Sequence, residues 1–343
     1  MHEVLNTLYI QTQGTYLALD HETVRVVIED VTRLRVPLIR LDGIVVFGQV
    51  NISPFLIHRC ADDGRALVWL SNTGRFKARI EGHVRGNVLL RRAQHLCVSD
   101  AARCLDVAQT IVAGKLQNSR QRILRAARDV KKPEHRLALR AVAAQLAANL
   151  LRIKHTRTLD ELRGVEGESG RGYFSVFNHM ISPQASAFSF DGRSRRPPRD
   201  RINALISFLY GLVRGECAAA LEGIGLDPQV GFLHVLRPGR PSLALDMMEE
   251  LRPVVADQFA LTLINRQQLR ADHFDEQPSG AVLLNEEGRK LVLHQYQERK
   301  HETVHHRLLD RAIPLGLVPH VQARILARYL RRDIQHYIPF LYR

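Results

Sequence analysis

Short apolar runs separated by polar turn residues dominate the first 86 residues of the chain. Such runs, rich in Val, Ile, Leu and Tyr, are typical of β-strands. Asp42-Gly43 lies between two of them and predicts a hairpin, and Asn72-Thr73-Gly74 predicts a turn. Ser53-Pro54 supplies an N-cap and a first helical residue for one short helix through Cys60. The predicted strands lie at residues 8–10, 15–19, 24–28, 38–41, 44–47, 66–70 and 76–80.

The pattern changes near residue 87. From residue 88 to 153 the apolar positions recur every three or four residues, which predicts α-helix, and Pro133 divides the segment into two helices. The apolar stripes indicate core or dimer-facing surfaces rather than a site. A short helix is expected at 158–162, an irregular glycine-rich stretch at 164–172, and a helix that resumes at Tyr173.

Helical segments also follow a polar loop at 182–200. Asp200 or Asn203 is expected to cap an apolar helix through Leu212. Pro241-Ser242 opens a further helix, which Pro253 kinks or restarts because proline lacks the backbone N–H.

The last segment predicts a two-stranded insert at 282–284 and 290–293, followed by a helical tail. Strands grouped before helices are typical of an α+β protein. We therefore expect a small N-terminal β domain at 1–86 and a larger helical domain at 87–343.

Charge narrows the range of partners. The chain has 343 residues, 45% of them hydrophobic, and a formal net charge of +14 to which arginine contributes most. Such an excess indicates a polyanionic partner, nucleic acid before a membrane surface, although a generally basic proteome is an alternative explanation. Arginine's planar guanidinium suits phosphate.

The same sequence lacks the marks of secretion and membrane insertion. The N-terminus has no basic region followed by an apolar one, and no window approaches the roughly 18 apolar residues of a membrane span. The four cysteines are scattered, which favours reduced, structural thiols. We expect a cytoplasmic protein.

Candidate chemistry centres on residues 231–253. Asp246 and Glu249 stand three apart, so a helix presents both on one face, whereas Glu250 is expected to be an ordinary exposed charge. His234 lies twelve residues before Asp246, across a Gly/Pro-rich turn. Carboxylates and an imidazole suit Mn²⁺ or Mg²⁺. On spacing alone, a solvated acidic face with a lone histidine explains the pattern equally well.

The glycine-rich stretch carries Glu166. It does not match G-x-x-x-x-G-K-[ST], and no strand precedes it, so a nucleotide-binding loop is disfavoured. The alternative is that its glycines let backbone or ligand approach Glu166. Glu166 with His234 and Glu249 would then supply two carboxylates and one imidazole, a set suited to metal-assisted chemistry on phosphodiesters.

Two further motifs need an interpretation. The loop at 182–200 is either a strap that contacts phosphates or a disordered solvated loop. His301-Glu302-Thr303-Val304-His305 matches H-E-x-x-H, the zinc-protease signature. Its flanks are polar on nearly every face, which favours a solvated helix over a protease site. The candidate phosphate contacts in the loop are Arg193, Arg195, Arg196 and Arg199.

Four motifs in this order resemble one known family, the CRISPR-associated endonuclease that serves as the integrase of spacer acquisition. They are GVEG at 164–167, RDRINALISFLYGL at 199–212, GFLH at 231–234 and RPSLALDMMEELRP at 240–253. The resemblance covers essentially the whole chain. The wording around Asp246 is most similar to the version that accompanies type I-C systems.

The resemblance implies a fold and a site. The fold would be an N-terminal β-sandwich-like domain joined to an α-helical catalytic domain. Glu166, His234 and Glu249 would hold Mn²⁺ or Mg²⁺, with Asp246 as an additional acidic position. Glu168 departs from the small residues usual after the GxEG element, so it is a competing ligand.

The resemblance also implies partners. Members form homodimers through the N-terminal region, and two dimers flank a central dimer of a small ferredoxin-like adaptation protein, giving a hetero-hexamer. The complex joins the 3′ ends of a short foreign duplex to a CRISPR repeat, and a trimming nuclease is a further suggested partner.

The resemblance thus implies a metal-dependent DNA endonuclease and integrase. Arg237 and Arg240 are candidates for steadying a phosphate oxygen or the neighbouring strand. Two alternatives stay open, a non-catalytic basic DNA-binding scaffold and a stand-alone metal-dependent nuclease.

Overall fold

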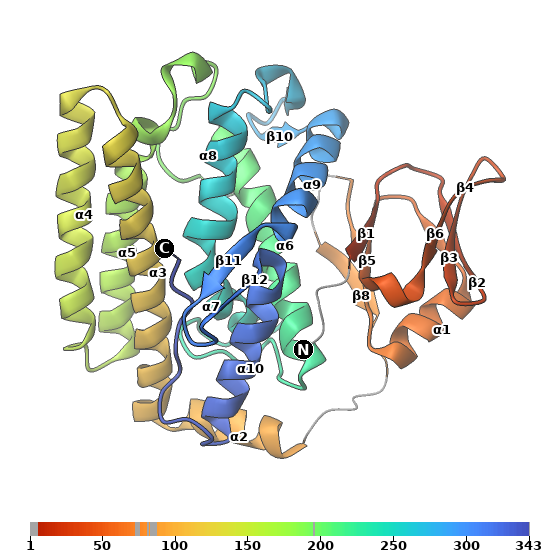
Figure 1. Ribbon diagram of the computed structural model, residues 1–343, viewed down its shortest axis with the longest axis horizontal. Coiled ribbons are helices and arrows are strands. Elements are labelled where there is room, and N and C mark those ends of the chain that lie inside the picture. The colour runs from red at the N-terminus through yellow and green to blue at the C-terminus, as the bar shows by residue number, and fades with distance from the viewer. Residues whose placement is uncertain (1–5, 73–75, 81, 83–87, 195, 343) are drawn as a thin grey trace. The chain divides into compact units, whose positions relative to one another are not determined.

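The computed structural model describes residues 6–72, 76–80, 82, 88–194 and 196–342. The chain divides into two compact units (Figure 1), one of residues 1–85 with 289–301 and one of residues 86–288 with 302–343. Strands dominate the first unit and helices the second, so the fold is mixed α+β, as the sequence predicts.

The first unit contains two four-stranded sheets and the helix at residues 54–63, which share a single apolar core, together with the helical residues 289–301. In the first sheet three strands run parallel and the last pairs antiparallel; in the second, antiparallel hairpins are extended by a short parallel strand. The first sheet has the order β1 (Asn6–Ile10), β5 (Leu41–Phe47), β7 (Ala66–Leu70), β8 (Phe76–Ile80), and the second β4 (Val31–Pro37), β3 (Thr23–Ile28), β2 (Tyr16–Asp20), β6 (Asn51–Ile52); α1 spans Pro54–Asp63 and a 3₁₀ turn Leu38–Arg40.

The predicted hairpin at Asp42-Gly43 is wrong, because β5 runs straight through it. Gly43 lies where β5 and β7 approach closely: a Cβ there would come 3.0 Å from the Ala66 carbonyl oxygen. The glycine therefore serves strand contact rather than a turn. The real turn is at Glu29 and Asp30, whose φ angles are positive, and it leads into β4, which the prediction missed.

The predicted cap of α1 is confirmed, since the Ser53 hydroxyl accepts the Leu56 backbone N–H and Pro54 is the first helical residue. Residues 73 and 74 of the predicted Asn72-Thr73-Gly74 turn lie outside the described part of the chain, as do residues 83–87. The division into 1–86 and 87–343, and the dimerisation role of the first domain, therefore stay predictions.

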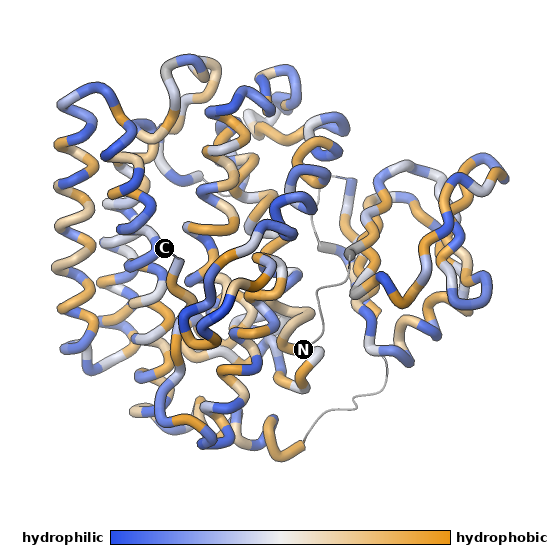
Figure 2. The backbone as a smooth tube through the Cα atoms, in the orientation of Figure 1, coloured by the Kyte–Doolittle hydropathy of each residue, from blue (hydrophilic) through white to orange (hydrophobic). Residues whose placement is uncertain are grey.

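The second unit is built around α3, which packs against α4 and α5 on one side and α7 on the other (Figure 1). Hydrophobic and hydrophilic positions alternate turn by turn along α4 (Figure 2), as expected for a helix with one buried face. The helices are α2 (Val88–Ser99), α3 (Ala101–Asp129), α4 (Pro133–Ile153), α5 (Leu159–Ser175), α6 (Arg201–Gly223), α7 (Ser242–Leu251), α8 (Gln258–Asn265) and α10 (Val318–Leu330).

Short elements connect these helices. Residues Arg252–Asp257 form a π-helical turn between α7 and α8, where Pro253 removes one backbone donor from the helical ladder. Helix α9 (Glu286–His301) begins in the second unit, and its residues 289–301 belong to the first. Two strand pairs are also present: β9 (Phe274–Glu276) with β10 (Val282–Leu284), and β11 (Thr303–His306) with β12 (Arg311–Pro314). Short 3₁₀ turns lie at Phe177–Met180, Pro183–Ala185, Ala271–His273 and Leu315–Leu317.

Several helix boundaries are confirmed. Pro133 separates α3 from α4, and Ser242 opens α7 after Pro241. The Asp200 carboxylate accepts the Asn203 backbone N–H at 2.7 Å and caps α6. A further break at Asp100 divides the segment 88–153 into three helices rather than two.

Two predicted irregular segments are regular. The glycine-rich stretch is not a break, because α5 runs without interruption from Leu159 to Ser175. Residues 290–293 are helical within α9, so the partner of β10 is β9 and not this segment. In both places tertiary packing stabilises a helix that the local helix propensity of the sequence does not predict.

Helix α6 is long and apolar enough to cross a membrane by length and composition, the one such helix in the part of the chain that is described. Half of its most apolar window is buried inside the structure, and α6 packs against α7 and α10. A core helix meets the same criteria, so the expected absence of a membrane span stays a prediction.

Gly164 tests the continuity of α5. It is exposed, and a Cβ at this position meets nothing within 4 Å. Gly164→Ala should raise the free energy of unfolding by roughly 0.5–1 kcal/mol, because alanine loses less backbone freedom in a helix. Denaturant midpoints would measure it. Gly172→Ala is the control. Its Cβ would lie 2.9 Å from Gln145 Oε1, so this variant should gain less stability than Gly164→Ala. A loss of stability in Gly164→Ala would indicate a left-handed turn instead.

Candidate active site

Asp246 organises the GFLH loop over the start of α7. Its side chain is fully buried, and its carboxylate accepts the backbone N–H groups of Phe232 (2.6 Å), Leu233 (3.0 Å) and His234 (3.0 Å). Gly231 allows this approach, because a Cβ there would lie 2.6 Å from the Ser242 carbonyl carbon. The loop is therefore fixed to the helix by one carboxylate.

The same carboxylate orients His234. Asp246 Oδ1 lies 2.6 Å from His234 Nδ1, and since a carboxylate only accepts, Nδ1 carries the proton. His234 Nε2 then lies 3.7 Å from Glu249 Oε1. A carboxylate behind a histidine is the usual arrangement for holding an imidazole toward a metal. Asp246 thus lies behind His234, on the side away from Glu249.

Glu166 and Glu249 meet at a third residue, Lys115, which the sequence analysis missed. Lys115 Nζ contacts Glu166 Oε1 and lies 2.7 Å from Glu249 Oε2. These residues come from α5, α7 and α3, so three helices converge at this point. The Glu249 side chain is only 3% exposed, whereas that of Glu166 is 28% exposed, so the cluster opens toward solvent on the Glu166 side.

Two arginines complete the surroundings and were also missed. Arg252 Nη1 lies 2.9 Å from Glu249 Oε1. Arg163 Nε and Nη2 donate to the Leu233 carbonyl oxygen at 2.9 and 2.7 Å, which anchors the GFLH loop to α5. In the sequence, these arginines are marked only as polar residues within apolar stripes. Such a position does not show which residue each guanidinium will contact.

Opposing effects set the ionisation of these groups. Burial raises the pKa of Glu249, but Arg252, Lys115 and His234 outweigh it and hold that pKa well below its ordinary value. Burial lowers the pKa of Lys115, but Glu249 and Glu166 outweigh it and the net effect raises that pKa. Both groups are therefore charged at neutral pH.

The donor chemistry fits a hard divalent cation, since carboxylate oxygens and an imidazole suit Mn²⁺ or Mg²⁺. Glu249 Oε2 is also buried, and the Lys115 ammonium, 2.7 Å away, is the only donor near it among the described residues. As they stand, however, no three His, Cys, Asp or Glu side chains in the described ranges are close enough to hold a metal. Lys115 lies between two of the candidate ligands.

Glu168, the competing ligand, points toward α4. Its carboxylate binds Arg152 at 2.8 Å, with Gln145 and Asn149 at 3.4 Å. The hydrogen bond from Arg152 is the main cause of its lowered pKa. Glu168 is therefore engaged on another face of α5 than Glu166.

The prediction that Glu250 is an exposed charge is wrong, because its side chain is fully buried. Its carboxylate accepts the Tyr337 hydroxyl (2.8 Å), Gln322 Nε2 (2.9 Å) and the Phe340 backbone N–H (2.9 Å). These bonds tie α7 to the C-terminal tail. Burial dominates and raises the pKa of Glu250 to about 7.

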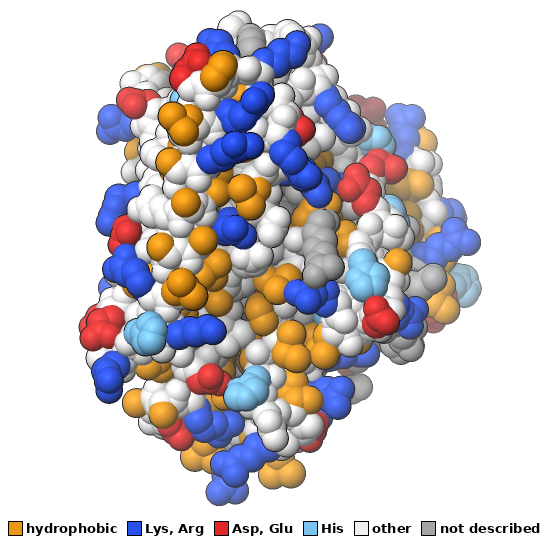
Figure 3. Space-filling view, turned by 60° about the vertical axis from the view of Figure 1, so that its left-hand side comes forward, with side chains coloured by type: hydrophobic (Ala, Val, Ile, Leu, Met, Phe, Trp, Pro, Cys, Tyr) orange, Lys and Arg blue, Asp and Glu red, His pale blue; other side chains and the backbone are white. Residues whose placement is uncertain are grey.

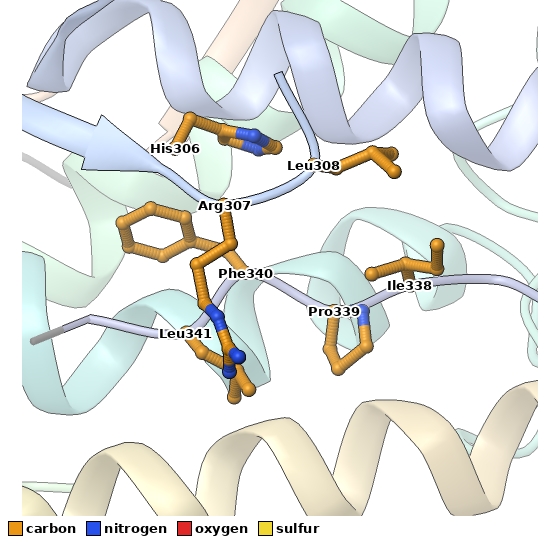
Figure 4. Close-up of a pocket in the computed structure, with 7 residues that line it drawn as sticks. All are labelled: His306, Arg307, Leu308, Ile338, Pro339, Phe340 and Leu341. Atoms are coloured by element: carbon orange, nitrogen blue, oxygen red, sulfur yellow. The ribbon is translucent and has the colours of Figure 1, made fainter. Parts of the chain in front are cut away.

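A cavity of about 370 Å³ lies beside this tail and contains none of the predicted site residues. Figure 4 shows its lining, with the segment after β11 on one side and the C-terminal tail on the other. The lining residues are His306, Arg307, Leu308, Ile338, Pro339, Phe340 and Leu341.

The predicted DNA-contacting arginines lie in different environments. Arg193 is engaged internally: it donates to Asn203 Oδ1 (2.6 Å) and Ser207 Oγ (3.1 Å) and lies over the Tyr210 ring. Arg195 lies outside the described residues. The others face solvent more openly: Arg196, Arg199 and Arg237 are exposed and Arg240 is half-buried.

The face in Figure 3 shows many Lys and Arg side chains among apolar and neutral ones, with fewer Asp and Glu. This distribution is that expected of a protein with a formal net charge of +14.

The H-E-x-x-H segment is not the solvated helix that was predicted. His301 ends α9, and Thr303–His306 forms β11. His305 Nε2 lies 3.2 Å from Asp310 Oδ1, and His306 is buried against Gln322. A zinc-protease site needs both histidines on one helix face, so this segment lacks the required geometry.

The fold and this cluster define a mixed α+β protein with a carboxylate–imidazole site in its helical unit. A family model described as CRISPR associated protein Cas1 matches residues 8–298. The chain belongs to the Cas1 family of CRISPR-associated proteins. It is 49% identical to a CRISPR-associated endonuclease Cas1 of Moorella thermoacetica and 44% identical to one of Chlorobaculum tepidum, each over 343 residues and all of both chains. A Cas4 exonuclease/Cas1 endonuclease fusion of Geobacter sulfurreducens is 32% identical, over 98% of this chain and 60% of the fusion.

Solved structures show the same fold. A Cas1 protein of Thermotoga maritima matches with a TM-score of 0.83 and 24% identity, over 97% of this chain and 99% of that one. A Cas6-RT-Cas1–Cas2 complex matches with a TM-score of 0.83 and 21% identity, over all of this chain and 36% of that one. A TtCas1–DNA complex matches with a TM-score of 0.56 and 14% identity, over 95% and 91%.

Asp246→Ala should unfold the GFLH loop. Three backbone N–H groups would lose their acceptor, and an unsatisfied buried donor costs about 1–3 kcal/mol. We expect the free energy of unfolding, measured by denaturant titration, to fall by at least about 2 kcal/mol. Asp272→Ala, which removes an exposed carboxylate paired with Arg270, is the control and should change little. An equally small change in both variants would contradict the role given to Asp246.

Glu250 should make stability depend on pH. Its folded pKa of about 7 exceeds the ordinary 4.5, so the folded state binds the proton more tightly. The resulting stabilisation is complete below pH 4.5 and is lost as pH rises through 7, by about 3 kcal/mol in all.

Thermal melting between pH 4.5 and 8 should therefore show a steeper decline in wild type than in Glu250→Gln. Asp257, whose pKa burial raises to about 6, contributes the same slope to both proteins. Parallel curves would contradict the assignment to Glu250.

Proposed function

We propose that this protein is a metal-dependent DNA endonuclease and integrase that joins the 3′ ends of short foreign duplexes to a CRISPR repeat by transesterification. One observation carries the proposal: Glu166, Glu249 and His234, from distant parts of the chain, gather at one partly open point. Family membership and the net charge of +14 support it. The sequence wording further supports a type I-C context.

Glu166, His234 and Glu249 would hold Mn²⁺ or Mg²⁺. A bound ion of this kind lowers the pKa of an attacking hydroxyl and neutralises charge that develops on phosphate oxygens. The chain's own residues fix the geometry. Asp246 holds the His234 ring, and Arg252 keeps Glu249 ionised and in place.

The reaction transfers a phosphoryl group without a covalent enzyme intermediate. A 3′-hydroxyl oxygen attacks a repeat phosphodiester in line, one P–O bond forms as another breaks, and the leaving 3′-oxygen takes up a proton while the attacking hydroxyl releases one. Arg237, which is exposed, and Arg240, which is half-buried, follow His234 in the same loop and would steady a non-bridging oxygen or the adjoining strand. With water as nucleophile, the same residues support hydrolysis.

The proposed partners are double-stranded DNA, a second copy of the chain, and a small ferredoxin-like adaptation protein in a hetero-hexamer. The Cas1–DNA and Cas1–Cas2 structures with the same fold support contacts with DNA and with a Cas2 protein for relatives, and the Cas4–Cas1 fusion supports a trimming nuclease as a further partner. We place this assembly in the cytoplasm.

His234→Ala tests the site. The variant should lose strand joining by at least about 100-fold, because the ligand set loses its imidazole, while binding of duplex in a mobility-shift assay stays within a few-fold. His155→Ala, an exposed histidine at the end of α4, is the matched control. Joining at wild-type rate in Mn²⁺ by His234→Ala would refute the assignment.

Two conditions separate the alternatives. A scaffold would bind DNA equally well with chelator and would neither nick nor join in Mn²⁺ or Mg²⁺. A stand-alone nuclease would cut at an unchanged rate when the donor carries a blocked 3′ end. An integrase loses joined product both on chelation and on blocking the 3′ end.

A further inference from the structure

Lys115 makes the contacts that a bridging metal would make. It lies in the middle of α3, its side chain is 13% exposed, and its ammonium contacts one oxygen of Glu166 on α5 and one of Glu249 on α7. One positive centre therefore joins carboxylates from two different helices. These are the two carboxylates that the proposed function assigns to the metal.

The contact with Glu249 is a close ion pair. The Lys115 ammonium lies 2.7 Å from Glu249 Oε2, and that buried oxygen has no other donor among the described residues. A buried carboxylate oxygen without a compensating group is costly. A group that replaced the ammonium at this oxygen would therefore have to bring positive charge of its own.

The ammonium and a divalent ion compete for the same two carboxylates. Glu166, Glu249 and the fully buried Asp246 carry three negative charges, and Lys115 and Arg252 carry two positive ones. A divalent ion bound to the oxygens that Lys115 contacts would lie directly against its ammonium and close to Arg252, and such like charges repel strongly away from bulk water. One resident cation must withdraw.

Lys115, not Arg252, is the one able to leave. The Arg252 guanidinium lies 4.6 Å from the centre of the Tyr210 ring. Tyr210 is itself fixed by donating to Asp257 Oδ1 at 2.8 Å. Lysine carries a compact charge on a flexible four-carbon stem. Its other partner, Glu166, is more exposed than Glu249, so the ammonium has a route outward.

We infer that Lys115 is a placeholder cation, which holds Glu166 and Glu249 together in the metal-free protein and which a divalent ion must displace in order to bind. The inference rests on the proposed metal site. It makes Lys115 a positioning residue that lowers metal affinity while it stabilises the metal-free form. Metal and ammonium are then negatively coupled through the two carboxylates.

Lys115→Met tests this coupling in the full chain after removal of metal with chelator. Methionine keeps the length and apolar stem but removes the charge. Calorimetric titration with Mn²⁺ should show a Kd lower by on the order of ten-fold than in wild type. In chelator the variant should melt at a lower temperature, because the carboxylates have lost a counter-charge, and its melting temperature should rise more on adding Mn²⁺.

Two controls isolate the charge. Lys115→Arg keeps a positive group, so its Mn²⁺ affinity should be no higher than that of wild type. Lys154→Met removes an exposed lysine just after α4 and should leave the affinity unchanged. Equal or weaker Mn²⁺ binding by Lys115→Met would overturn the inference, as would equal tightening in Lys115→Arg. Absence of Mn²⁺ binding in wild type and Lys115→Met alike would instead refute the proposed metal site.

A measurement on the wild-type protein keeps the test valid if Lys115→Met fails to fold. Reductive methylation followed by peptide mass spectrometry reports how accessible each lysine amine is. Lys115 should be labelled several-fold faster with saturating Mn²⁺ than with chelator, while Lys154 is labelled equally in both. Unchanged or slower labelling of Lys115 with Mn²⁺ would overturn the inference.

Discussion

Three carboxylates lie buried on one short helix, and the surrounding structure is organised to compensate them. Ionised groups away from water are costly unless paired. Each of the three carboxylates of α7 is compensated in a different way. Asp246 accepts three backbone N–H groups and His234, Glu249 is held by Lys115 and Arg252, and Glu250 has a pKa near 7 and binds the C-terminal tail.

Helix α3 supplies the opposite wall of this arrangement. Lys115 faces the site, whereas the preceding Gly114 lies against the tail, where a Cβ would come 2.7 Å from Pro339. One turn further, Asn118 donates to the carbonyl oxygens of Glu250 and Phe340, both at 2.8 Å. The tail therefore clamps α3 to α7 directly behind Lys115 and Glu249.

The sequence predicted well where local rules apply. Capping at Ser53 and Asp200 and the proline boundaries at Pro133 and Pro241 depend on neighbouring residues, and the structure confirms them. It predicted poorly where glycine occurs inside a regular element. Gly43 serves close packing of two strands, and the glycines of α5 are carried by a helix held through its neighbours, so neither marks a turn.

By itself, the sequence determined the α+β class, the family resemblance, and the residue types of the candidate site. These properties follow from periodicity and motif spacing between residues that are close in the chain. Asp246 and Glu249, for example, stand three residues apart on one helix. Only the tertiary structure decided that Glu250 is buried, that Glu168 faces α4, and that Lys115 lies between Glu166 and Glu249. Those contacts join helices that are distant in the chain, so no local sequence pattern shows which charged residues will pair.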